Sequence, residues 1–191
     1  MRLCRSTAEN AVRTLLRYIG EDPTRPGLQD TPKRVVRALD ELFSGVKLTN
    51  AEIAERYGKC FEDGASHDMV VVRDIPCFSF CEHHLMLMYD MSISIAYLPQ
   101  GKILGLSKFA RIAKAVCARP QVQERIGTDI ADIVTAATGS PHVAVAIRAK
   151  HSCMTARGVN ANGGGHTVTH TLRGNFMSDA ALRAEVLSAL A

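Results

Sequence analysis

Residues 89–98 alternate strictly between apolar and small or polar side chains. One set of positions holds Met91, Ile93, Ile95 and Tyr97, and the other holds Ser92, Ser94 and Ala96. Because successive side chains of a β-strand point to opposite faces of the sheet, this pattern predicts a strand with one buried face. The remaining elements must therefore include helices that cover that face.

Periodicity and capping residues predict the elements on either side of this strand. Helices are expected at 6–19, 31–43, 51–57, 107–116, 121–138 and 180–190, and extended segments at 69–72, 77–80, 103–106, 142–149 and 166–172. This order predicts an α+β fold with an antiparallel sheet and helices on one face. We expect residues 1–66 to form an N-terminal helical region and 67–191 a second region built on the sheet. The exposed edges of so small a sheet favour oligomerisation.

The composition excludes some classes of function. A net charge of +4 and the absence of Trp argue against a nucleic-acid partner. No apolar stretch approaches the roughly 20 residues of a membrane span, and arginines interrupt any signal-peptide core near the N-terminus. We therefore expect a cytoplasmic protein without a membrane partner, whose six cysteines are thiols.

Cys81-Glu82-His83-His84 follows an extended segment and has the C-x-x-H spacing of metal ligands. Cys153 follows another predicted strand, so Cys81, His84 and Cys153 are candidate ligands of a zinc ion with one open position. The counting also allows a closed structural site, whose fourth ligand would be one of His83, His151, Cys77 and Cys117. Alone, the C-x-x-H spacing also fits a buried cysteine beside two surface histidines.

Several further residues lie where chemistry could be done. His83 and His151 sit beside the proposed ligands, where an imidazole suits acid–base catalysis, although ordinary polar residues fit as well. Ser107, Lys108 and Arg111 open a predicted helix and could bind phosphate, unless they form a solvated basic face. Gln123 and Glu124 could read the donor edge of a purine, or Glu124 could simply favour a helix N-terminus.

Five ordered motifs together resemble the GTP cyclohydrolase I family, zinc-dependent type. They are Thr31-Pro32-Lys33-Arg34, Cys81-Glu82-His83-His84, Gly105-Leu106-Ser107-Lys108 with Arg111, Arg119-Pro120-Gln121-Val122-Gln123-Glu124-Arg125, and His151-Ser152-Cys153 with Arg157-Gly158. The resemblance implies a tunnelling fold, in which sheets from several subunits close into a barrel. It also implies a homodecamer of two stacked pentamers, with active sites at subunit junctions.

The resemblance also implies roles for individual residues. One zinc ion per subunit would be bound by Cys81, His84 and Cys153, and His83 and His151 would be the acid–base pair. Ser107 would assist proton transfer at the ribose, and Gln123 and Glu124 would hold the guanine ring. Lys108, Arg111, Arg157, Arg34 and Arg37 would face the triphosphate.

The implied reaction is hydrolytic opening of the GTP imidazole ring at C8, with release of formate. An Amadori rearrangement and reclosure then give 7,8-dihydroneopterin triphosphate, the first step of pterin and tetrahydrofolate synthesis. The glycine- and histidine-rich stretch at 163–170 departs from the family, and His142, His166 and His170 match no family site. The alternatives are a non-catalytic structural zinc protein and a zinc deaminase, whose H-x-E and P-C-x-x-C signatures are absent.

Overall fold

The computed structural model describes residues 4–62, 68–161 and 165–191. They form two compact units, Met1–Ser44 and Gly45–Ala191. The boundary lies before the expected one at residue 66, because helix α3 (Asn50–Tyr57) packs in the second unit against α4 (Leu106–Cys117) and α5 (Gln123–Thr138). Ile53 of α3 is fully buried in the core of that unit.

The first unit contains two helices, α1 (Arg5–Tyr18) and α2 (Thr31–Leu42), close to the bounds that the sequence predicts. Gly20 follows α1 with φ +87°, a backbone conformation that favours glycine. Pro32 lies in the first turn of α2, where its missing N–H costs no hydrogen bond. An ion pair of 2.8 Å between Arg5 and Asp40 joins the two helices.

The second unit is built on a five-stranded sheet of order β5-β2-β3-β6-β7. Its strands are β2 (Val70–Cys81), β3 (Leu87–Tyr97), β5 (Pro120–Gln121), β6 (Val143–His151) and β7 (Thr167–Leu172). The neighbours from β2 to β7 are antiparallel, and only β5 runs parallel to its partner β2. Two short strands, β1 (Cys60–Glu62) and β4 (Lys102–Leu104), pair separately.

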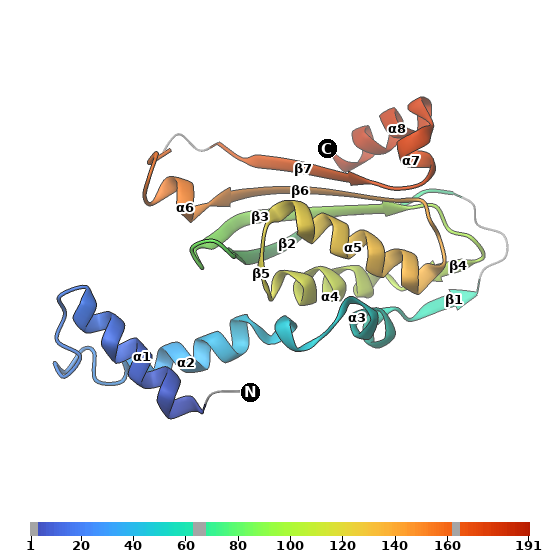
Figure 1. The fold of residues 1–191 in the computed structure, drawn as a ribbon. Coiled ribbons are helices and arrows are strands. Elements are labelled where there is room, and N and C mark those ends of the chain that lie inside the picture. The colour runs from blue at the N-terminus through green and yellow to red at the C-terminus, as the bar shows by residue number, and fades with distance from the viewer. Residues whose placement is uncertain (1–3, 63–67, 162–164) are drawn as a thin grey trace. The chain divides into compact units, whose positions relative to one another are not determined.

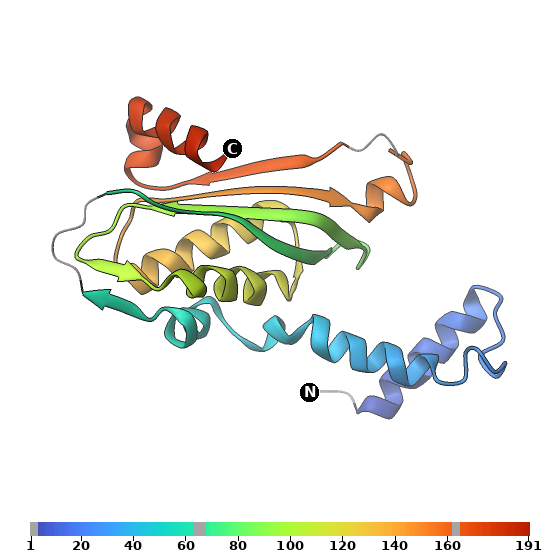
Figure 2. The ribbon, with the colours of Figure 1, turned by 180° about the vertical axis from the view of Figure 1, so that it is seen from behind.

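Helices cover both faces of this sheet, so the expectation of helices on one face is wrong. On one side, α3, α4 and α5 cover a core that includes Ile93, Ile95 and Phe109 (Figures 1 and 2). On the other side, α8 (Ala180–Leu190) follows the short α7 (Asn175–Ser178) and buries Val186 and Leu190. The small residues of the alternating strands, such as Ala96, leave room for α8 on that face.

Two details of the sheet differ from the sequence-based expectation. The segments expected at 69–72 and 77–80 form one continuous strand, β2. Its pairing with β3 contains two register shifts. The helix expected from Gln121 begins only at Gln123, because Pro120 and Gln121 add a short strand beside Phe80 and Cys81. A short 3-10 helix (Ser44–Lys47) and α6 (Ser152–Thr155) were not expected.

The register of the sheet brings three chain segments together at one end. Phe80 lies opposite Leu87, Met88 lies opposite His151, and Cys81 lies beside Gln121. The end of β2, the start of β3 and the end of β6 therefore meet near the candidate metal ligands Cys81, His84 and Cys153. Among the described residues, no helix has both the length and the apolar character needed to cross a membrane.

Candidate metal centre and active site

The proposed ligands Cys81, His84 and Cys153 come together at this end of the sheet. Cys81 is the last residue of β2, His84 lies in the turn that follows, and Cys153 lies in α6 directly after β6. Their sulfur and imidazole nitrogen atoms all lie within 4.8 Å of one another. Ligand atoms around a tetrahedral zinc ion are roughly 3.3–3.8 Å apart, so small side-chain movements suffice. Two thiols and one imidazole suit zinc and leave one position open.

Backbone and side-chain contacts fix the turn that carries His84. The amide of Leu85 donates to the carbonyl of Cys81, and the amide of Cys81 donates to the carbonyl of Met86, both at 2.8 Å. Leu85 has φ +51°, an uncommon value for a residue with a side chain. Glu82 anchors the turn to α5 through an ion pair with Arg125 of 2.5 Å, and this contact holds the pKa of Glu82 below its usual value.

The two thiols have different surroundings. Cys81 is buried, and its sulfur lies 3.5 Å from Nδ1 of the exposed His83. Cys153 is half-buried. Burial, and after it the neighbouring Cys81, raise the pKa of the Cys153 thiol, and Arg157 lowers that pKa to a smaller extent. His83 and Arg157 therefore both lie beside the ligand cluster, and both are exposed to solvent.

His151 is held by the buried amide of Gln123, whose residue is only 2% exposed. Nε2 of Gln123 donates to the carbonyls of Ile147 at 3.1 Å and Thr167 at 3.0 Å. These acceptors fix the amide orientation, so Oε1 faces Nε2 of His151 at 2.8 Å and accepts its hydrogen. Burial lowers the pKa of His151, which favours the neutral ring with its lone pair on Nδ1.

Glu124 lies in the first turn of α5 with an exposed side chain. It forms one wall of a shallow groove of about 510 Å³ beside β7, which Thr128, Thr169, Thr171 and Arg183 also line. The groove places a carboxylate next to three hydroxyl groups. Glu124 is therefore accessible to a ligand, whereas the adjacent Gln123 is bonded to the protein.

A model of the family described as GTP cyclohydrolase I matches residues 8–191. The chain belongs to the GTP cyclohydrolase I family. GTP cyclohydrolase 1 of Clostridium beijerinckii is 50% identical over 94% of this chain and 93% of its own length. The enzyme of the Loch Maree strain of Clostridium botulinum is 51% identical over 90% of this chain and 89% of its own length. The crystal structure of the archaeosine synthase QueF-Like in the apo form is similar to 59% of this chain and 97% of its own chain, with 18% sequence identity and a TM-score of 0.44. This likeness is too distant to support an argument.

In this GTP cyclohydrolase I family member, the predicted ribose and phosphate residues at the start of α4 do not reach the metal centre within one chain. Helix α4 begins next to β4, and the amide of Leu104 in β4 donates a hydrogen bond to the hydroxyl of Tyr97 at 2.9 Å. The helix ends at Cys117, whose carbonyl accepts a hydrogen bond from the hydroxyl of Ser79. Tyr97 ends β3, whereas the metal centre adjoins its start. The beginning of α4 thus lies at the far end of the sheet (Figure 1). It carries Ser107, Lys108 and Arg111.

Two other predicted phosphate ligands, Arg34 and Arg37, lie exposed on α2 of the first unit. Arg34 forms an ion pair of 3.2 Å with Asp30. Two of the three histidines without a family role have local partners: Nδ1 of His142 accepts from the amide of Asn175, and His166 contacts Asp90. His170 is exposed. In the glycine-rich stretch at 162–165, residues 162–164 lie outside the described part of the chain.

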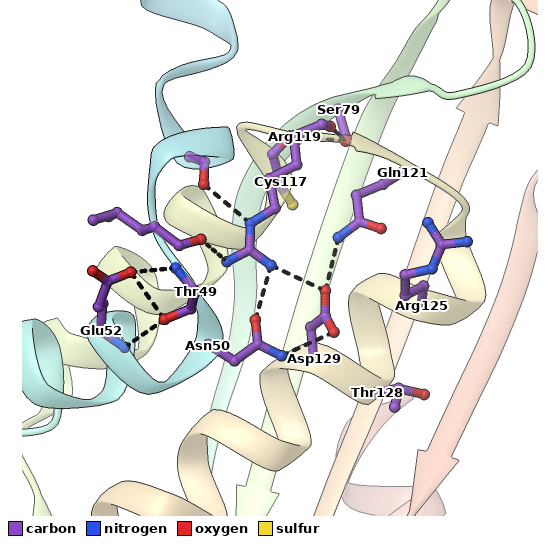
Figure 3. A network of polar contacts seen from close by, with 12 residues as sticks. Thr49, Asn50, Glu52, Ser79, Cys117, Arg119, Gln121, Arg125, Thr128 and Asp129 are labelled. Atoms are coloured by element: carbon purple, nitrogen blue, oxygen red, sulfur yellow. Dashed lines mark hydrogen bonds and ion pairs between the residues drawn. The ribbon is translucent and has the colours of Figure 1, made fainter. Parts of the chain in front are cut away.

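The sequence did not indicate a partly buried network of polar contacts around Arg119 (Figure 3). The guanidinium group of Arg119 donates to two carbonyls and two side chains, those of Gly45, Leu48, Asn50 and Asp129. Asp129 also accepts from Gln121 at 2.9 Å, and the carbonyl of Gln121 accepts from the amide of Glu82 at 3.0 Å. Arg119 and Asp129 lie ten residues apart on different elements, so no sequence periodicity reveals this pair.

Proposed function

We propose that the protein is a zinc-dependent GTP cyclohydrolase I. It opens the imidazole ring of GTP at C8, releases formate and recloses the product as 7,8-dihydroneopterin triphosphate, the first step of pterin and tetrahydrofolate synthesis. The observation that carries this proposal is the convergence of Cys81, His84 and Cys153 beside His151 in a chain of this family. We assign the reaction to the cytoplasm, whose reducing conditions suit six unpaired cysteines.

The three donors would hold one zinc ion in each subunit. A zinc ion bound in this way polarises water and lowers the pKa of that water to about 7. Cys81 is the more sheltered ligand. Burial and then Cys81 raise the pKa of the Cys153 thiol, and Arg157 offsets this only in part, so binding of the metal would drive the deprotonation that a thiolate ligand requires.

His151 and His83 would move protons during hydrolysis. With its Nε2 hydrogen held by Gln123, neutral His151 can accept a proton at Nδ1. We therefore assign Gln123 to the orientation of His151 and leave recognition of the guanine ring to the exposed carboxylate of Glu124. His83 would act from the solvent side of the cluster, where its ring lies beside Cys81.

The triphosphate and ribose would be bound by groups from more than one chain. Ser107, Lys108 and Arg111 lie at the far end of the sheet, so we propose that a second copy brings them to the metal centre, in a homodecamer. Ser107 would assist proton transfer at the ribose, and both cations would bind phosphate oxygens. Arg157 would come from the same chain as the metal ligands, and Arg34 and Arg37 would add further positive charge.

Incubation with GTP tests the proposal. We expect formate release that depends on zinc, and a pterin fluorescence after oxidation of the product. Cys153→Ala should lose both the metal and turnover, whereas His83→Ala should retain stoichiometric zinc and lose turnover. Substoichiometric zinc in purified His83→Ala would identify His83 as a ligand. Ammonia in place of formate would indicate a deaminase, and bound zinc without either product would indicate a structural metal site.

A further inference from the structure

The first residues of β3 hold the connection between β6 and β7. The hydroxyl of Ser152 donates to the carbonyl of Leu87, the hydroxyl of Tyr89 lies 3.2 Å from that of Thr155, and Nε2 of His166 lies 3.1 Å from Oδ2 of Asp90. The connection carries Cys153 and Arg157. Three residues at the start of one strand, Leu87, Tyr89 and Asp90, thus contact this segment at three places.

Asp90 is the unusual member of this set. It lies in a bulge of β3, between the pairs Tyr89–Lys150 and Ser92–Arg148, and has φ +50°. A non-glycine residue in this region of backbone space costs roughly 1–2 kcal/mol, and Asp tolerates it better than most. The same oxygen, Oδ2, also contacts Nζ of Lys150 at 3.1 Å. Lys150 and then His166 hold the pKa of Asp90 below its usual value.

The three anchors support different parts of the connection. Ser152 and Thr155 flank Cys153, so their hydrogen bonds hold the metal ligand directly. The amide of Ala161 donates to the carbonyl of Met154 at 2.9 Å, which closes the turn that contains Arg157. His166 follows this turn in the chain, beyond residues 162–164, which lie outside the described part, and its contact with Asp90 is separate from the two contacts that flank Cys153.

We propose that Asp90 is a positioning residue that fixes the distal end of the β6–β7 connection and thereby holds Arg157 for an anionic substrate. This inference rests on the proposed function, in which Arg157 faces the triphosphate of GTP. Among the described residues, the side-chain contacts of Asp90 are with His166 and Lys150, and the metal ligands are not among them. Asp90 acts through His166 and Lys150, which approach its carboxylate from the start of β7 and the end of β6.

The chain contains a matched control for Asp90. Asp74 lies in a bulge of β2 with φ +55°, almost the same backbone conformation. Its carboxylate accepts from the hydroxyl of Ser92 at 3.1 Å and lies 3.8 Å from Arg73. These partners belong to β2 and β3, and not to the β6–β7 connection. Asp74→Asn therefore repeats the chemical change at a similar bulge without releasing Arg157.

Steady-state kinetics with GTP and the zinc content of each purified variant test the proposal. Asp90→Asn and His166→Ala should raise KM about three- to tenfold, the range of one or two partly exposed hydrogen bonds, with kcat and zinc content unchanged. His166→Gln should preserve the KM of the wild type, because the amide nitrogen of Gln can occupy the place of Nε2. Asp74→Asn should also preserve it.

Hydrogen exchange gives a readout that does not depend on turnover. Amides at 152–161 should exchange faster in Asp90→Asn than in the wild type, and should be unchanged in Asp74→Asn. Unchanged exchange in Asp90→Asn would overturn the proposal, as would an unchanged KM or a parallel loss of zinc. If the wild type does not turn over GTP, the proposed function fails, and faster exchange in Asp90→Asn alone would still support the anchoring role of Asp90.

Discussion

The guanidinium group of Arg119 donates four hydrogen bonds, so the effect of removing it on the stability of the protein can be worked out from the structure. The side chains of Arg119 and Asp129 are each 15% exposed, and their ion pair measures 3.3 Å. Arg119 directly precedes strand β5, and its guanidinium group contacts both the segment from Gly45 to Asn50 and the helix α5 (Figure 3). Arg119→Met keeps much of the side-chain volume and removes every hydrogen-bond donor.

The cost follows from the acceptors that Arg119→Met leaves behind. The carbonyl of Leu48 and Oδ1 of Asn50 lose the guanidinium donor, whereas the carbonyl of Gly45 still accepts from the amide of Leu48. Asp129 loses its cationic partner and still accepts from the side-chain amides of Gln121 and Asn50. Removing one member of a buried ion pair costs about 3–5 kcal/mol. At roughly 2–4 °C per kcal/mol for a unit of this size, the melting temperature should fall by about 6–20 °C. Arg119→Lys should be intermediate, because one ammonium group cannot reach all four acceptors.

Thermal unfolding followed by circular dichroism measures this effect, with Arg125→Met as the control. Arg125 also forms an ion pair, with Glu82, but the two side chains are 48% and 32% exposed. Such a pair contributes about 0–1 kcal/mol, so Arg125→Met should change the melting temperature by only a few degrees. The double variant Arg119→Met/Asp129→Leu should recover part of the loss. Equal effects of Arg119→Met and Arg125→Met would refute the reasoning.

Two further variants test local geometry. Gly45→Ala should destabilise the protein by about 3 kcal/mol or more in urea unfolding, because the new Cβ would lie 2.1 Å from the carbonyl oxygen of Ala115. At Gly139 a new Cβ would lie in open space, and only the positive φ disfavours alanine, so Gly139→Ala should lower the free energy of unfolding by about 1 kcal/mol. Equal losses of stability in Gly45→Ala and Gly139→Ala would contradict this account. Gln123→Met should lower kcat about 10- to 100-fold with zinc content retained, since His151 loses its acceptor. An unchanged kcat would show that Gln123 does not position His151.

Much of the fold could be predicted because its signals are local. The alternation at 89–98 specifies β3, whose inward residues Ile93, Ile95 and Tyr97 are fully buried. Apolar spacing likewise indicates helices α2, α4 and α5 near their true bounds, although none of the three has a side-chain hydrogen bond at its N-cap. The grouping of Cys81 with Cys153 could be inferred because both follow strands, and antiparallel pairing then brings those strand ends together.

The features that the sequence did not reveal depend on long-range packing. The position of α8 is an example, because the apolar residues of that helix do not indicate which face of the sheet they will cover. Strand β5 contains only two residues, Pro120 and Gln121, too few for a periodicity to identify. The sequence predicts neither the bulge at Asp74 nor that at Asp90, because only the paired strands show where the register shifts.

The distribution of candidate residues along the sheet bears on what one chain can do alone. The metal ligands, His151 and Glu124 depend on the register of β2, β3 and β6 and on the start of α5, all within one unit. Ser107 and Lys108 begin a helix of 12 residues that runs away from β4, a length of about 18 Å. Side chains of their size cannot span that distance to the metal centre. An isolated subunit should therefore retain the metal-binding geometry, while the binding of a triphosphate substrate requires the proposed assembly.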